Sequence, residues 1–475
     1  MNFEGIIGLE IHVEMKTKSK MFSSAPVSFG DAPNTNVDPL DMAMPGAMPT
    51  VNKQAVVNAI RVCHALHLNI DDELWFDRKN YFYSDLAKGF QITQQKRPIG
   101  TNGWLEIEGD NGEIKRIDIL RLHLEEDTCK QHHAKNRTLL DYNRSGIPLL
   151  EIVSKPQIRS GKEAMNFVEA IRSIVTFLDV SDGKMEEGSL RCDVNVSIRP
   201  IGSDTYGPKV EIKNISTLNN IQKGIDFEIK RQERVLLSGG NVLQETRRFD
   251  ETSKETVAMR MKTDEIDYKF FTEPNIAPIK LSKEFINDAI ESSPELAEVK
   301  MKRYQKLGLS SYSAKILVAN KEISEYYDAL LSFGADPKLA SNWVIVDIQT
   351  VLNKENKTIQ NFSITPQNLA KLIVSIGKGE VSNKQGREIF EKMLIDNSDP
   401  STLIKEKGTS LINDEKALLL IINQVLLENP QSIVDYRNGK DKAVGYLVGK
   451  VMQLTKGQAN PALTNKLIVM RLKGE

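Results

Sequence analysis

Apolar and polar residues alternate in several segments within the first 290 residues of the chain. Successive side chains of a β-strand point to opposite faces of a sheet, so this alternation predicts strands with one apolar and one polar face. The predicted strands are Ile6–Met15, Ile117–Leu124, Leu190–Ile198 and Lys209–Ile212. Apolar residues that recur about every 3.6 positions predict helices between these strands. The predicted helices are Asn52–Leu68, Gly161–Leu178 and Ile221–Leu237. Together they predict an α+β fold for this part of the chain.

The pattern changes after Ser292-Ser293-Pro294, where strand periods end and helical periods take over. Helical periods extend through Leu330 and recur at Trp343–Leu352, Asn368–Ile376, Ala417–Glu428 and Lys442–Leu454. Polar segments at 382–384 and 396–400 are expected to be loops between helices. The sequence therefore predicts a strand-rich domain at residues 1–293, an all-helical domain at 294–405 and a helical tail at 406–475.

The bulk composition supports a multidomain globular protein. A length of 475 residues fits about three domains, and 40% hydrophobic with 27% charged residues is ordinary for a soluble protein. Cys63, Cys129 and Cys192 are isolated, which fits a reducing compartment and favours neither a disulfide framework nor a thiolate zinc site. The N-terminus does not read as a signal peptide, and no uncharged apolar run reaches about 18 residues. We therefore expect a cytoplasmic protein that does not enter a membrane.

Charge is unevenly distributed although the net charge is only −1. This total argues against binding nucleic acid over the whole surface. The segment Arg437–Glu475, however, contains eight Lys and Arg residues but only two acidic residues. The candidates for contacts with nucleic-acid phosphates are Lys440, Lys442, Lys450 and Lys456. A basic helix pair that is merely solvated explains the same pattern, and the charge alone does not decide between the two.

The polar faces of the four predicted strands carry charged and hydrogen-bonding residues, and the Glu, Asp, Asn and His among them can bind metal ions. They are Glu10, His12 and Glu14; Arg121, His123 and Glu125; Arg191, Asp193, Asn195 and Ser197; and Glu211 between Lys209 and Lys213. A solvated face of an antiparallel sheet would need no function. Yet carboxylates gathered on one face repel one another, and a hard divalent cation such as Mg²⁺ or Mn²⁺ removes that repulsion. A divalent-metal site is therefore plausible on this face.

Several common catalytic signatures are missing from the sequence. There is no phosphate-binding GxxxxGK[ST] loop, no GxGxxG turn, no HExxH helix and no Ser/Gly-rich amidase signature. Cys63 lies in an apolar helical segment and is expected in the core rather than as a nucleophile. The chain is therefore not expected to hydrolyse glutamine itself.

Six long segments give the sequence a specific resemblance. They are IGLEIHVE at Ile7–Glu14, FDRKNYFY at Phe76–Tyr83, DYNRSGIPL at Asp141–Leu149, KMEEGSLRCD at Lys184–Asp193, QETRRFD at Gln244–Asp250 and KGQANP at Lys456–Pro461. In this order they resemble the GatB family, the B subunits of aspartyl/glutamyl-tRNA amidotransferases, over nearly the whole chain. The resemblance implies a cradle-like N-terminal domain that holds ATP and Mg²⁺, and helical and tail domains that bind tRNA.

The resemblance also implies a reaction and its partners. The A subunit, an amidase, releases ammonia from glutamine, and a small C subunit is the third member of the complex. The B subunit phosphorylates the side-chain carboxylate of Glu-tRNA(Gln) or Asp-tRNA(Asn), and ammonia then displaces the phosphate. This is an ATP-dependent carbon–nitrogen ligase with glutamine as amide donor.

Residue roles follow from the resemblance together with the strand faces. The implied metal ligands are His12, Glu125 and Glu211; the implied ATP-binding residues are Glu10, Asp193 and Asn195; and the implied catalytic residues are Glu125, Arg191 and Lys213. Arg191 and Lys213 could hold phosphate oxygens, or could only pair with the carboxylates on their own face. Lys79 and Lys88 flank the aromatic segment Tyr81–Tyr83 and are candidates for a polar ammonia path, although surface lysines are common.

The sequence departs from the family pattern at several positions. Many members carry four cysteines that resemble a zinc site, whereas this chain has Ser23, Ala25, Asp38 and Asp41 there. A structural zinc is therefore not expected. Asn275 stands where the family usually has Asp, which removes a carboxylate. A catalytically silent tRNA-binding scaffold and a free-standing divalent-metal phosphotransferase are the alternative functions, but neither explains the ordered segments.

Overall fold

The computed structural model describes residues 2–261, 267–407, 414–437, 440, 442–455 and 457–473. The chain divides into two compact units, Met1–Leu296 and Ala297–Glu475. Every described strand lies in the first unit, and the described elements of the second unit are helices. The α+β fold predicted from the sequence, strand-rich first and helical afterwards, is confirmed.

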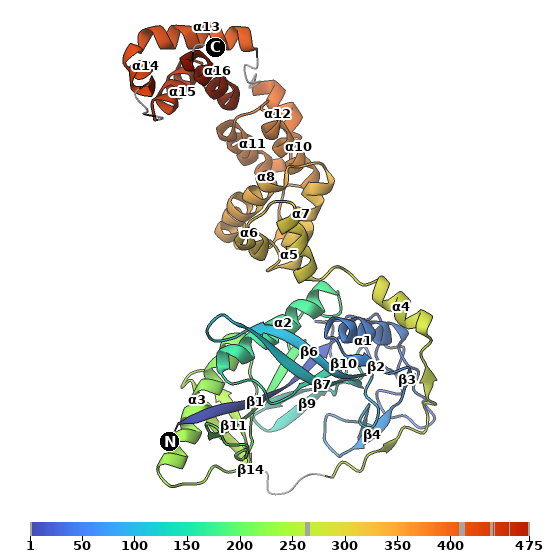
Figure 1. Ribbon diagram of the computed structural model, residues 1–475. Coiled ribbons are helices and arrows are strands. Elements are labelled where there is room, and N and C mark those ends of the chain that lie inside the picture. Colours follow the sequence, from blue (N-terminus) through green and yellow to red (C-terminus); the bar gives the residue numbers. More distant parts are fainter. Residues whose placement is uncertain are drawn as a thin grey trace. The chain divides into compact units, whose positions relative to one another are not determined.

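The first unit is built on a sheet of nine described strands, in the order β14-β13-β12-β11-β1-β10-β7-β6-β2 (Figure 1). Their bounds are β1 Phe3–Glu14, β2 Asn69–Ile70, β6 Gly100–Glu108, β7 Ile114–Glu126, β10 Pro148–Ser154, β11 Leu190–Pro200, β12 Val210–Lys213, β13 Glu245–Asp250 and β14 Glu255–Met261. Among the described pairs of this sheet, β12 and β13 run parallel and the others antiparallel. The long strands β1, β7 and β11 are those with the clearest alternation in the sequence.

Three helices cover the apolar face of this sheet (Figure 1). They are α1 Lys53–Ala65, α2 Gly161–Phe177 and α3 Leu218–Leu237. Each begins at a polar cap, since the side chains of Asn52, Ser160 and Thr217 accept hydrogen bonds from the first-turn amides. Ile11 of β1 and Phe167 of α2 are fully buried in the shared core. Because side chains alternate along a strand, the polar residues of these strands point to the opposite face of the sheet.

Small sheets and one helix complete the first unit. They are β4 Asp77–Asn80, β5 Phe90–Thr93 and β15 Phe271–Thr272; β3 Glu73–Leu74 with β16 Ile279–Lys280; β8 Lys130–Ala134 with β9 Arg137–Asp141; and α4 Lys283–Glu291, which packs on α1. Strand β5 is joined to the end of β7, because the Ile92 amide donates to Glu126 Oε1 at 3.0 Å. Thr93 of β5 also donates to Glu125 Oε2 at 3.4 Å, and both Glu125 and Glu126 are buried.

The described part of the second unit consists of helices. Their bounds are α5 Ala297–Lys306, α6 Ser311–Leu317, α7 Lys321–Ser332, α8 Pro337–Asn342, a π-helical stretch Trp343–Ile348, α9 Gln349–Glu355, a 3₁₀ turn Ile359–Asn361, α10 Pro366–Gly377, α11 Asn383–Asp396, α12 Pro400–Lys407, α13 Glu415–Glu428, α14 Pro430–Arg437, α15 Lys442–Leu454 and α16 Pro461–Lys473. The loop predicted at 382–384 is wrong, because Ser382 caps α11 and residues 383 and 384 are its first turn. The segment 396–400 does separate α11 from α12.

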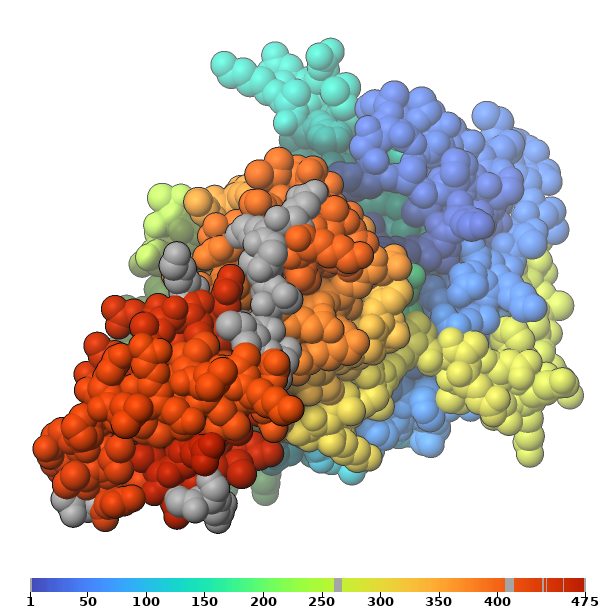
Figure 2. Space-filling view, turned by 90° about the horizontal axis from the view of Figure 1, so that it is seen from above, coloured from blue at the N-terminus to red at the C-terminus, as the bar shows by residue number. Residues whose placement is uncertain are grey.

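The last four helices, α13 to α16, share a core of their own. Leu418, Ile422, Leu447 and Ile468 are fully buried in it. In the space-filling view the orange and red side chains of this bundle lie against one another on the visible face (Figure 2). In the part of the chain that the structure describes, no single helix has the length and apolar character to cross a membrane. Among the described helices, α13 and α14 pass on length and composition when taken together, and an 89° bend separates them.

Candidate functional site

The strand registers place one row of charged side chains across the polar face of the large sheet. His12 of β1 lies opposite Glu151 of β10 on one side and opposite Arg191 of β11 on the other. Glu151 in turn lies opposite His123 of β7. Directly opposed residues point to the same face of a sheet. The register therefore brings His123, Glu151, His12 and Arg191 side by side, although they are far apart in the sequence.

Three of the residues near this row can hold a metal ion. The ligand atoms of His12, Glu125 and Glu151 all lie within 4.8 Å of one another. His12 Nε2 is 3.4 Å from Glu151 Oε2 and 3.7 Å from Glu125 Oε1. His123 Nε2 lies on the other side of the same carboxylates, 3.2 Å from Glu151 Oε2 and 3.6 Å from Glu125 Oε2. One imidazole and two carboxylates form a donor set that suits a divalent cation.

The electrostatics of this cluster favour positive charge beside its carboxylates. Burial lowers the pKa of His12, but the hydrogen bond and charge of Glu151, with the charge of Glu125, outweigh burial and raise it. Burial also opposes protonation of His123, yet Glu151 and Glu125 raise the pKa of His123 to about 9. Burial acts to raise the pKa of Glu151, but the two histidines bring it well below its ordinary value. A divalent cation bound here would take the place of the histidine protons.

A second pair of buried carboxyl groups lies beside the cluster. The pKa of Glu14 is raised to about 8, first by burial and then by the nearby Asp127 carboxylate. Burial would raise the pKa of Asp127 as well, but Arg191 and Arg144 hold it below its ordinary value. Arg191 donates to Asp127 Oδ2. Arg191 therefore has a carboxylate partner. Pairing with carboxylates was one of the two roles that the sequence left open for it, the other being contact with phosphate oxygens.

The residues expected to bind ATP lie on the same face, farther along β1 and β11. Asn195 Nδ2 donates to Glu10 Oε1 at 2.9 Å, and Glu10 lies opposite Asp193. Lys213 Nζ donates to Asp193 Oδ2 at 2.6 Å and lies 3.4 Å from Glu211 Oε1. Both candidate phosphate-binding cations, Arg191 and Lys213, thus pair with carboxylates.

Glu211 shares the polar face but not the metal cluster. It lies on β12, two strands away from β1, and opposite Asn195 rather than near His12. Its Oε2 accepts a hydrogen bond from Thr246 Oγ1 at 3.0 Å. The structure therefore brings His12 and Glu125 together with Glu151, and places Glu211 elsewhere on the sheet. The role of Glu211 as a metal ligand stays a prediction.

A groove of about 250 Å³ continues the site from Glu10 along the sheet. Gly8 forms part of its floor, and Tyr206 and Pro156 line it. Two buried atoms that face this region, Asn195 Oδ1 and Ser197 Oγ, have no hydrogen-bond partner among the described residues. Buried polar atoms are nearly always paired. The groove therefore offers a ligand both an apolar surface and unused hydrogen-bonding atoms.

The two lysines expected on an ammonia path lie in different surroundings. Lys88 Nζ contacts both carboxylate oxygens of Glu126 at 2.5 Å and is nearly buried. Lys88 also lines a cavity of about 210 Å³. Lys79 Nζ lies over the rings of Tyr268, at 4.8 Å, and Tyr81, at 5.8 Å. Of these two lysines, Lys88 is thus the one that lines a described cavity, and it is paired with Glu126.

Three of the four candidate tRNA-binding lysines are described. Lys440 pairs with Asp435 at 3.1 Å, and Lys442 begins α15. Both line an open groove of about 510 Å³ with Tyr446. Lys450 Nζ lies over the Tyr446 ring at 5.7 Å. Lys456 lies outside the described residues.

Glu151 is a candidate site residue that the sequence alone did not identify. It is the only charged residue in β10, Pro148–Ser154, whose other residues are mostly apolar. A single carboxylate in a central apolar strand is a signal in itself, because burying a charge without a partner is unfavourable. Its partners, however, come from β1 and β7, and only the strand register identifies them.

Comparison with known proteins identifies the family to which the chain belongs. Residues 5–287 match the family described as the GatB/GatE catalytic domain, and residues 325–472 match the GatB domain. The chain is 49% identical over 471 residues, 99% of both chains, to the B subunit of the aspartyl/glutamyl-tRNA(Asn/Gln) amidotransferase of Geobacillus thermodenitrificans, and equally to that of Geobacillus kaustophilus. Against the Bacillus pumilus protein of the same name it is 48% identical over the full length of both chains. The chain therefore belongs to the family of B subunits of aspartyl/glutamyl-tRNA(Asn/Gln) amidotransferases.

Proposed function

We propose that this chain activates the side-chain carboxylate of Glu or Asp esterified to tRNA(Gln) or tRNA(Asn), as the B subunit of a glutamine-dependent ligase. The observation that carries the proposal is the convergence of His12, Glu125 and Glu151 on one sheet face in a chain of this family. A carboxylate oxygen of the substrate attacks the γ-phosphorus of ATP, and ADP leaves. Ammonia then attacks the acyl carbon, phosphate leaves, and the amide forms after loss of a proton.

The residues of the cluster would hold Mg²⁺ for the first step. His12, Glu125 and Glu151 supply three ligand atoms, and water and phosphate oxygens complete the shell that Mg²⁺ prefers. When bound, Mg²⁺ neutralises the phosphate charge and orients the phosphoryl group in line with the attacking oxygen. Glu211 lies outside this cluster. We propose that it contributes a metal ligand on the β12 side of the same face, where Asp193 and Lys213 lie.

The groove beside Glu10 would receive the nucleoside part of ATP. Asn195 Oδ1 and Ser197 Oγ are free to accept hydrogen bonds, and Tyr206 offers a ring for stacking. The triphosphate would then run from the groove towards His12, past Lys213 and Arg191. Each of these cations would exchange its carboxylate partner for a phosphate oxygen. Stabilisation of charge, rather than a covalent nucleophile, would supply most of the rate.

The partners follow from the second step. The A subunit, an amidase, would deliver ammonia, a small C subunit would be the third member of the complex, and Lys79 and Lys88 would line the ammonia path. The helical unit with Lys440, Lys442, Lys450 and Lys456 would bind the tRNA. Such an enzyme works where aminoacylated tRNA is used, so we place it in the cytoplasm.

The test is phosphate release from ATP by the heterotrimeric complex, with and without Glu-tRNA(Gln). Glu125→Gln keeps the size of the side chain but removes a ligand charge, and we expect release to fall at least about 100-fold, the usual scale for one such group. Glu106→Gln, an exposed residue on the neighbouring strand β6, is the control and should act as wild type. Phosphate release that does not depend on tRNA, or that is unchanged in Glu125→Gln, would favour the catalytically silent scaffold instead.

A further inference from the structure

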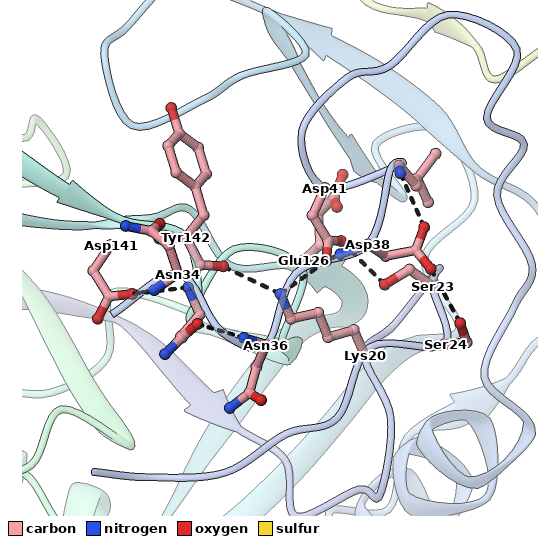
Figure 3. Close-up of polar contacts among 12 residues, drawn as sticks. Lys20, Ser23, Ser24, Asn34, Asn36, Asp38, Asp41, Glu126, Asp141 and Tyr142 are labelled. Atoms are coloured by element: carbon pink, nitrogen blue, oxygen red, sulfur yellow. Dashed lines mark hydrogen bonds and ion pairs between the residues drawn. The ribbon is translucent and has the colours of Figure 1, made fainter. Parts of the chain in front are cut away.

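A buried ion pair lies in the segment between β1 and α1, which contains neither helix nor strand in its described residues. Lys20 is almost fully buried, and its Nζ donates to Asp41 Oδ2 at 2.8 Å and to Tyr142 O at 3.1 Å. Figure 3 shows the ammonium group between these two acceptors. The Asp41 carboxylate also accepts from Ser23 Oγ at 3.1 Å and from the Asp38 amide at 3.0 Å. Asp41 thus joins three points of the segment.

The pair is interdependent because both charges are buried. Burial lowers the pKa of Lys20, and Asp41, Asp38 and Glu126 only partly offset this effect. Removing one partner of a buried ion pair leaves an uncompensated charge. The backbone is also shaped for the pair. Gly146 has φ +84°, and a Cβ there would lie 2.8 Å from Asp41 Oδ1 and 3.2 Å from Lys20 Cδ.

Further hydrogen bonds fasten the same segment to residues 141–143 (Figure 3). The Asn34 amide donates to Asp141 Oδ1 at 3.0 Å, and the Tyr142 amide donates to Asn34 Oδ1 at 2.7 Å. The Asn36 amide donates to Asn143 Oδ1 at 2.8 Å. Ser23, Asp38 and Asp41 therefore belong to a network centred on Lys20.

The segment forms one wall of the 210 Å³ cavity that contains Lys88. Leu40, directly before Asp41, lines this cavity together with Met44 and Pro49. Arg78 and Lys88 also line it, and Lys88 is paired with Glu126. The ion pair therefore fixes the position of Asp41, which directly follows Leu40 in the segment that lines the cavity.

We propose that Lys20 is a positioning residue for amidation: its ion pair with Asp41 holds residues 40–49 as the wall of this cavity and keeps ammonia beside Lys88 and Glu126. The role rests on the function proposed above. Lys20 touches none of the reacting atoms. Its loss is therefore expected to let ammonia escape, not to stop the phosphoryl transfer or the hydrolysis of glutamine.

The experiment measures coupling in the heterotrimeric complex, as glutamate released per amidated tRNA formed. In Lys20→Met we expect this ratio to rise at least about five-fold, while glutamine hydrolysis continues and phosphate release still depends on tRNA. A double variant, Lys20→Met with Asp41→Asn, leaves no unpaired buried charge. Its ratio of glutamate to amidated tRNA should be no higher than that of Lys20→Met. Lys16→Met is the matched control, because it removes a lysine four residues away whose pair with Asp179 is more than half exposed.

Amide hydrogen exchange separates positioning from general misfolding. Exchange should rise in residues 21–51 of Lys20→Met and stay unchanged in α2. A wild-type coupling ratio in Lys20→Met, or a uniform rise of exchange across the first unit, would overturn the role of Lys20. A wild-type complex that forms no amidated tRNA from ATP and glutamine would refute the proposed function itself, and with it this role.

Discussion

At the scale of single residues, the site places two histidines on either side of two carboxylates. Glu151 is shared, because it is 3.4 Å from His12 Nε2 and 3.2 Å from His123 Nε2. His123 Nδ1 is buried without a hydrogen-bond partner among the described residues, so its contacts to the carboxylates are made through Nε2 alone. Protons and metal ions should therefore compete for this cluster.

This competition predicts how stability depends on pH. Folding raises the pKa of His123 from 6.5 to about 9, so its stabilising contribution is complete below pH 6.5 and is lost as the pH rises through about 9. In EDTA, we expect His123→Gln to reduce the free energy of unfolding by on the order of 2 kcal/mol more at about pH 6 than at about pH 10. Saturating Mg²⁺ should shrink this difference, because the metal takes the place of the protons.

Urea unfolding across this pH range measures the effect, with His64→Gln as the control because His64 is exposed at the end of α1. If both variants changed with pH in the same way, the cluster would not be the origin of the dependence.

At the scale of elements, one buried glutamate holds a helix to the sheet edge that supports Glu211. Glu228 of α3 is fully buried, and it accepts hydrogen bonds from Arg231 at 2.6 Å and from Thr256 Oγ1 of β14 at 2.7 Å. Arg247 of β13 lies 3.5 Å from the same carboxylate. Through β13 this network positions Thr246, which donates to Glu211.

Removing the charge of Glu228 should therefore loosen the edge of the sheet. We expect Glu228→Gln to lower the free energy of unfolding by about 3–5 kcal/mol, the range for breaking a buried ion pair. Amide exchange should rise in β13 and β14 before it rises in β1. Glu233→Gln, a partly exposed residue of the same helix, is the comparison. Equal losses in the two variants would show that the network adds nothing beyond a surface charge.

Elements also show how far the sequence could predict this structure. The strands β1, β7 and β11 and the faces on which Glu10, His12 and Glu125 lie were predictable, because a period of two is a local property. Glu151 was missed because β10 is apolar on both faces around it, and its partners depend on register. Helix α11 was partly missed because Ser382, with Gln385, forms a capping box from residues that also favour turns.

At the scale of the whole molecule, the two compact units carry different kinds of charge. The first gathers carboxylates on a sheet face, where we propose that a cation and a nucleotide bind. The second ends in a bundle with its own core, rich in Lys and Arg from residue 437 onward. This division suits a reaction in which one unit does the chemistry and the other holds a polyanionic substrate.

If the tail binds tRNA phosphates, charge reversal there should change the salt dependence of binding and not only its strength. We expect Lys442→Glu to weaken tRNA binding and to reduce the slope of log K against log salt by about 0.7–0.9 for each phosphate that is no longer neutralised. Lys283→Glu makes the same change of charge at an exposed residue of α4 in the first unit, and should leave the slope unchanged.

Filter binding over a series of salt concentrations gives both the affinity and the slope. Equal effects of the two variants would mean that only net charge matters, and no effect of Lys442→Glu would mean that this lysine is simply solvated. A change confined to Lys442→Glu would instead place the tRNA backbone at the groove that Lys442 shares with Lys440 and Tyr446.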